Sequence, residues 1–191
     1  LLLDIHLRRT EAWAIRLSER LGLQEDQRSA LARAGLAHDL GKRRRVWQRS
    51  IKRFKEPPLA KGPMQPLELG HYRHELGSLH DGDFKGLSDD AKELALHAVA
   101  AHHGRARPHF PIIESFDPEL KEDIVASLVR EVPLRFDRLQ RRIQRRLRLA
   151  VRPGLLTVVL VMQSRRMRLR DSPCSASLGS MGRSRRSRAC C

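Results

Sequence analysis

The sequence predicts an all-α domain followed by an irregular basic tail. Apolar residues recur at helical spacing through the first 140 residues, prolines and glycines separate these segments, and no convincing alternating strand pattern is present. The chain has 191 residues, a length that suits one domain with a sizeable core. Aromatic residues make up only 4% of the chain, so we expect a core built mainly from Leu, Ala, Val and Ile.

Two helices are expected at the start of the chain. The first covers residues 6–23 with Gly22 as its stop, and the second covers residues 24–42 and ends near Gly41. On the first helix the expected inward residues are Leu7, Trp13, Ala14, Leu17 and Leu21. On the second helix they are Ala30, Leu31, Ala34, Leu36 and Ala37.

Shorter elements follow. Residues 43–54 read as a short helix, and residues 55–70 read as a loop because they contain four prolines and two glycines. Residues 71–80 predict one or two helical turns. A longer helix is expected over 88–104, with Ser88 as its N-cap and Gly104 as its stop. The remaining expected elements are a turn at 107–111, a helix over 117–132 with Pro118 at its first position, and the start of another helix at 133–143.

The net charge of +16 lies mostly in the tail. Residues 1–140 contain 24 Lys and Arg against 21 Asp and Glu, whereas residues 141–191 contain 14 Arg and one acid, Asp171. We therefore expect a nearly neutral domain over residues 1–145. Residues 146–191 form an Arg- and Ser-rich tail that is interpreted as disordered or translated out of frame, with a basic nucleic-acid arm as the alternative.

The cysteines, the apolar segments and the first residues of the chain bear on its cellular compartment and on its relation to a longer protein. All three cysteines lie in the tail, so disulfides do not organise the domain, and a reducing, cytoplasmic compartment is expected. No segment approaches the roughly 20 apolar residues of a membrane span, and no signal pattern is present, so no membrane contact is expected. Because the chain opens without Met and inside an expected helix, we interpret it as a piece of a longer protein.

The histidines carry the strongest chemical signal. His38 and Asp39 close one small-residue helix just before a glycine, and His102 and His103 close another in the same way. His74 and His6 are further candidates. A buried Asp39 needs a cation or hydrogen-bond donors, and a plain salt bridge to Lys42 is one solution. A metal site is the other. Imidazoles with few carboxylates suit Mn, Fe, Co, Ni or Zn, and a carboxylate that bridges two such ions suits phosphoryl chemistry.

Rival chemistries lack their motifs in this chain. No phosphate-binding GxxxxGK[ST] loop, no GxSxG nucleophile elbow and no CxxC pair is present.

The ordered set of His6, "HDLGK", "RHE" and "HHG" in an all-α chain resembles the HD superfamily of metal-dependent phosphohydrolases. It is most similar to the HD nuclease domain of the CRISPR-associated helicase-nuclease of type I interference systems. The resemblance covers about residues 1–145 and implies an HD-domain helical bundle. It also implies cleavage of single-stranded DNA by metal-activated water. The implied partners are a DNA helicase domain, in the same or a partner chain, and an RNA-guided CRISPR surveillance complex.

The resemblance also implies a site with two divalent transition-metal ions. One ion would be held by His6, His38 and Asp39. Asp39 would bridge to a second ion held by His74, His102 and His103, while Lys42 would help to bind or polarise a phosphate.

The chain departs from the family at one point. The family places a later aspartate about 60 residues after "HHG", where this chain reads "TVVLVMQSRR", and Asp171 is the nearest acid. This departure makes a truncated, impaired copy one expectation. Two alternatives stay open: a phosphohydrolase that acts on nucleotides or signalling nucleotides, and an inactive fragment that binds nucleic acid.

Overall fold

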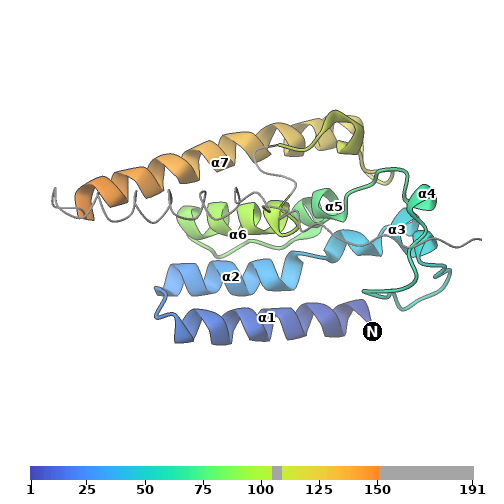
Figure 1. The fold of residues 1–191 in the computed structure, drawn as a ribbon, viewed down its shortest axis with the longest axis horizontal. Helices are drawn as coiled ribbons and strands as arrows, with labels where there is room; N and C mark the ends of the chain where they lie inside the picture. The colour runs from blue at the N-terminus through green and yellow to red at the C-terminus, as the bar shows by residue number, and fades with distance from the viewer. Residues whose placement is uncertain (105–108, 151–191) are drawn as a thin grey trace, which may run out of the picture. The chain divides into compact units, whose positions relative to one another are not determined.

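The computed structural model of the chain describes residues 1–104 and 109–150, the last five of them as backbone. The prediction of an all-α domain is confirmed: over these residues the only pairing of β type is an isolated bridge between Leu2 and Leu59. The elements are α1 (Leu3–Arg20), α2 (Glu25–Ala37), η1 (Leu40–Arg43), α3 (Arg45–Ser50), α4 (Pro66–Leu69), α5 (His74–Asp81), α6 (Asp89–Ala101), η2 (Ile112–Glu114) and α7 (Glu122–Ala150), where η marks a 3-10 turn (Figure 1). The expected tail lies almost wholly outside the described residues.

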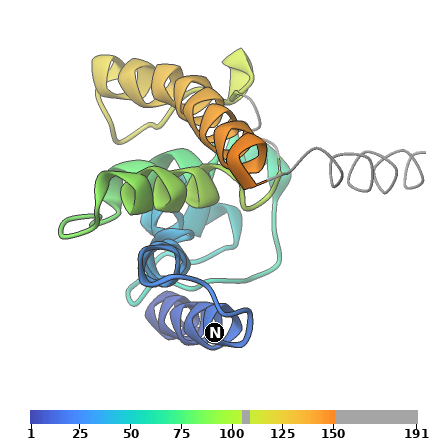
Figure 2. The same ribbon diagram turned by 90° about the vertical axis from the view of Figure 1, so that its left-hand side faces the viewer.

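The long helices stack in the order α1, α2, α6 and α7 in both views (Figures 1 and 2). α1 and α2 form an antiparallel pair that comes close at Gly35, where a Cβ would lie 3.1 Å from the backbone of Glu11. α6 packs against α2 and α5. α7 is held to α6 by ion pairs, among them the one from Arg138 Nε to Glu93 Oε2 at 2.7 Å. None of the helices described here is long and apolar enough to cross a bilayer.

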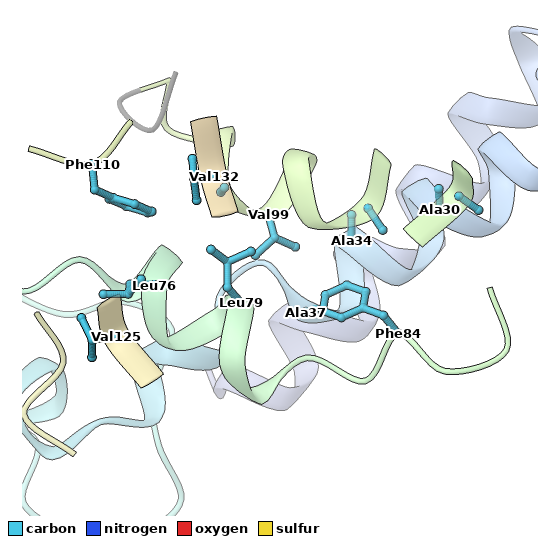
Figure 3. Packing of buried hydrophobic residues seen from close by; sticks show 13 residues of the cluster. Ala30, Ala34, Ala37, Leu76, Leu79, Phe84, Val99, Phe110, Val125 and Val132 are labelled. Atoms are coloured by element: carbon cyan, nitrogen blue, oxygen red, sulfur yellow. The ribbon is translucent and has the colours of Figure 1, made fainter. Parts of the chain in front are cut away.

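The main core lies where α2, α5, α6 and α7 meet (Figure 3). α2 contributes only small residues to it, which lets α6 approach closely, and α5 contributes Leu76 and Leu79. The full set of buried members is Ala30, Ala34, Ala37, Leu76, Leu79, Phe84, Ala91, Ala95, Val99, Ala100, Phe110, Val125 and Val132. Among the described residues its buried aromatic members are two phenylalanines, in keeping with the low aromatic content of the chain.

The predicted inward face of α1 is wrong in part. Leu7 is buried, but Trp13, Leu17 and Leu21 are each more than half exposed, because α1 is the outermost helix and packs against α2 along one side only. On α2, Ala30, Ala34 and Ala37 are buried as predicted.

At three prolines the elements differ from the prediction. Pro66 begins a one-turn helix, α4, inside the segment expected to be a loop, at the first helical position that proline tolerates. Pro118 does not begin a helix, because α7 starts at Glu122. Pro133 does not start a new helix, because α7 continues through it. Contacts hold α7 on both sides of this proline: Val132 is buried before it, and Arg138 pairs with Glu93 after it.

The predicted N-cap of α6 is confirmed. The Ser88 hydroxyl accepts a hydrogen bond from the backbone N–H of Ala91. The turn expected at 107–111 lies partly outside the described residues.

Candidate metal centre

The change from α2 to η1 shapes the centre. α2 ends at Ala37, His38 keeps helical dihedrals, and Asp39 leaves the helix with φ −111° and ψ 9°. Because the backbone unwinds here, two adjacent side chains reach the same point: His38 Nε2 lies 3.3 Å from Asp39 Oδ2. A regular helix would separate their directions by about 100°.

Gly41 brings this turn against the start of α5. A Cβ at Gly41 would lie 2.0 Å from the carbonyl oxygen of His74, so no other residue fits without moving the backbone. The Gly41 N–H donates to Ser78 Oγ at 2.9 Å, and its carbonyl accepts from Tyr72 Oη at 2.9 Å. These contacts hold His74 opposite Asp39.

The two carboxylate oxygens of Asp39, which is 2% exposed, face different histidines. His6 Nε2 lies 3.0 Å from Oδ2, the oxygen that also faces His38. On the other side, Nε2 of His74 and of His102 lie 3.0 and 3.6 Å from Oδ1. Within the described part of the chain, Oδ1 accepts no hydrogen bond of regular geometry. The carboxylate thus joins two sets of imidazoles.

All six residues that the sequence suggested as metal ligands are brought together. His6, His38 and Asp39 form one group, and Asp39 belongs also to a second group with His74, His102 and His103. Within each group the possible ligand atoms lie within 4.8 Å of one another. Lys42 lies at the same place, with Nζ 2.7 Å from Asp39 Oδ2, so the ion pair weighed from the sequence is formed in this structure.

Hydrogen bonds on the far side of two rings set their tautomers. His38 Nδ1 lies 2.8 Å from the carbonyl of Gly35, and His102 Nδ1 lies 2.7 Å from that of Val99. A carbonyl only accepts, so each Nδ1 is the donor of this hydrogen bond, and each Nε2 is the ring atom that faces the centre. This arrangement is typical of metal-ligating histidines.

Burial keeps several of these imidazoles neutral. It lowers the pKa of His6 and of His74, and together with the neighbouring His102 it lowers the pKa of His103 to about 4. Burial acts to raise the pKa of Asp39, but the surrounding imidazoles outweigh it and hold that pKa well below its usual range. Neutral imidazoles around one carboxylate fit divalent transition ions.

Sequence reasoning missed several buried charged groups, among them Glu75 and Arg44. Glu75 is fully buried; its Oε2 lies 3.6 Å from His74 Nδ1, and the carboxylate is paired with Arg73. An acid inside the apolar stretch "HELGSL" is the signal that could have found it. Arg44 bonds to both Asp81 and Asp117 and fastens the turn after the centre.

The other histidines lie outside both groups. Those for which the structure shows a partner include His80, which bonds to Asp81, and His97, whose ring packs against Phe136. His71 and His109 are exposed.

Comparison with known protein families gives a match. A family model described as "Cas3, HD domain" matches residues 2–162, a range that runs past the boundary expected at residue 145. Neither a curated protein nor a solved structure matches the chain.

Proposed function

Because the chain belongs to the Cas3 HD-domain family, a family of metal-dependent hydrolases, we propose that it is a nuclease domain that cleaves single-stranded DNA. The family acts with CRISPR complexes and on DNA. We further propose that this chain works in the cytoplasm, with a helicase domain that delivers the strand and with an RNA-guided surveillance complex.

One observation carries the proposal: Asp39 offers one oxygen to each of two histidine groups. His6, His38 and Asp39 would hold one divalent ion, and Asp39 with His74, His102 and His103 would hold the other. When bound, two such ions supply activation of water and stabilisation of charge that develops on a phosphate. Mn, Fe, Co, Ni and Zn all suit this set of donors.

The protein's own groups have distinct tasks around these ions. Asp39 sets the spacing of the two groups, and the carbonyls of Gly35 and Val99 fix the orientation of His38 and His102. Lys42 is paired with Asp39, and its ammonium would contact a phosphate oxygen of the strand at the metal-loaded centre.

The test uses the purified full chain with Mn or Ni, offered single-stranded DNA and nucleoside triphosphates in parallel. We expect DNA cleavage. Hydrolysis of free nucleotides with intact DNA would refute the nuclease and support the nucleotide phosphohydrolase. DNA binding with no hydrolysis of either substrate would support an inactive fragment that lacks the family's later aspartate, whose expected position lies outside the described residues.

Substitutions then test the ligand assignment. Asp39→Ala should remove both ions and all hydrolysis, because both groups depend on its carboxylate. The controls are histidines outside the groups: His71→Ala, His80→Ala, His97→Ala and His109→Ala. Metal content is measured on each variant, and retention of two ions by Asp39→Ala would refute the assignment.

A further inference from the structure

A pocket of about 380 Å³ borders the second histidine group. Four polar residues line it. His74 and His103 are candidate ligands, while Lys42 pairs with Asp39 and Arg73 pairs with Glu75. Its remaining lining is apolar: Trp47, Met64, Leu69 and Tyr72. The size lies within the range of small-ligand sites, and the lining joins reactive groups to an apolar wall.

The apolar wall is firmly held. Trp47 and Tyr72 are buried and pack in one cluster with Ile51. Met64 is 45% exposed, and its Sδ lies 3.2 Å from Ser50 Oγ, which donates its proton to the Trp47 carbonyl oxygen at 2.7 Å. A thioether beside a polar centre offers a flat ligand a surface on which to pack.

The cations of the pocket are already neutralised by carboxylates. Lys42 Nζ is paired with Asp39, and it also lies 5.2 Å from the centroid of the Trp47 ring, so it touches both the centre and the pocket. Arg73 is paired with Glu75. Arg73 is thus neutralised, and Lys42 is assigned to the phosphate at the centre itself, so the rest of the pocket favours an uncharged, flat group over a second phosphate.

A second pocket, of about 440 Å³, differs in character. None of the six candidate ligands is among its lining residues in the described part of the chain, and its Arg33 and Arg43 are paired with Asp83 and Asp4. Of these two pockets, the smaller one joins an apolar wall to the histidines.

The geometry points to a nucleoside subsite beside the metal centre: the pocket seats the sugar and base of the nucleotide whose phosphate lies at the histidines. This inference rests on the proposed phosphodiesterase function and adds to it a contact with the base. The base packs against Met64 and Leu69, while the buried aromatic rings support them from behind.

The experiment measures binding by titration calorimetry to the metal-loaded full chain, with dTMP and 2-deoxyribose 5-phosphate as probes. These ligands share the sugar and phosphate and differ only in the base. We expect dTMP to bind about tenfold more tightly, which corresponds to about 1.4 kcal/mol. Equal dissociation constants would overturn the subsite, and this comparison needs no variant.

A matched pair of substitutions locates the effect. Leu69→Trp fills the pocket and should abolish the preference for dTMP. Leu67→Trp makes the same change on the same one-turn helix, where Leu67 is 97% exposed and absent from the lining, and should keep it. An unchanged preference in a folded Leu69→Trp chain with normal metal content would also overturn the subsite. A preference for dTMP in a chain that cleaves no DNA would support the subsite and refute the nuclease function.

Discussion

Replacing Gly41 by alanine should damage the fold and the metal centre together. The added methyl group would lie 2.0 Å from the His74 carbonyl oxygen and 2.9 Å from the Ser78 backbone nitrogen. Both atoms belong to the backbone of α5, so no side-chain rotation relieves the clash. The turn that carries Asp39 and the helix that carries His74 must separate.

The structure sets the size of the effect. Ordinary van der Waals contact begins at 3.4 Å, so the contact of 2.0 Å requires a separation of about 1.4 Å. Such overpacking costs about 1–3 kcal/mol. The separation also breaks two buried hydrogen bonds of Gly41, to Ser78 and from Tyr72, at about 1 kcal/mol each. We expect a loss of about 3–5 kcal/mol in the free energy of unfolding, or roughly 6–20 °C in melting temperature.

The centre should lose one ion before the other. The separation lengthens the 3.0 Å contact between His74 Nε2 and Asp39 Oδ1 but leaves His6 and His38 beside Asp39. Metal content after equilibrium dialysis should therefore fall from two ions to one per chain.

The assay combines thermal unfolding with metal analysis on the same preparation. The control is Gly22→Ala, at a residue with φ +63° and no heavy atom within 4 Å of the added methyl. It should cost only backbone strain of roughly 1–2 kcal/mol and keep both ions. A Gly41→Ala chain with the parent's melting temperature and two bound ions would show that the close approach does not position His74.

Three further predictions concern parts of the fold away from the centre. Arg44→Met should cost about 3–5 kcal/mol in urea unfolding, because it leaves the buried carboxylate of Asp117 and the partly buried one of Asp81 without their cation. Ser88→Ala should cost about 1 kcal/mol in the same assay, because the N–H of Ala91 loses its cap. The third prediction concerns the stability of the fold at low pH. Burial acts to raise the pKa of Asp81, but hydrogen bonds from Arg44 outweigh burial and hold that pKa below 3.8 in the folded chain. The stability from this pair is therefore fully present above about pH 4 and is lost as the pH falls through the lower, folded-state pKa. Melting temperatures from pH 5 to 2 should fall less steeply for Asp81→Asn than for the parent chain.

The ligand set was predictable because its members stand at helix ends. His38 with Asp39 and His102 with His103 each follow a run of small residues, and small residues let helices approach closely enough for their ends to meet. The sequence does not show which histidine faces which oxygen of Asp39. That division depends on the unwound turn at Asp39 and on the approach of Gly41 to α5, which are tertiary features.

Other features depend on which elements pack together in the fold, so the spacing of apolar residues does not predict them. The stripe of Trp13, Leu17 and Leu21 has helical spacing, yet spacing does not show whether another element covers it. Pro133 is a typical helix breaker, but packing of α7 on α6 holds the helix together across it. The pair of Arg44 with Asp117 joins residues 73 positions apart, so local sequence carries no trace of it.

Charge balance links the two ligand groups to the proposed chemistry. The two ligand groups contain five imidazoles but one carboxylate, so two divalent ions would leave a large excess of positive charge in a buried place. Such a centre stabilises an anion, and a phosphodiester is an anion that reaches it as part of a strand. A buried Asp39 would be costly without a cation, and Lys42 supplies one at 2.7 Å.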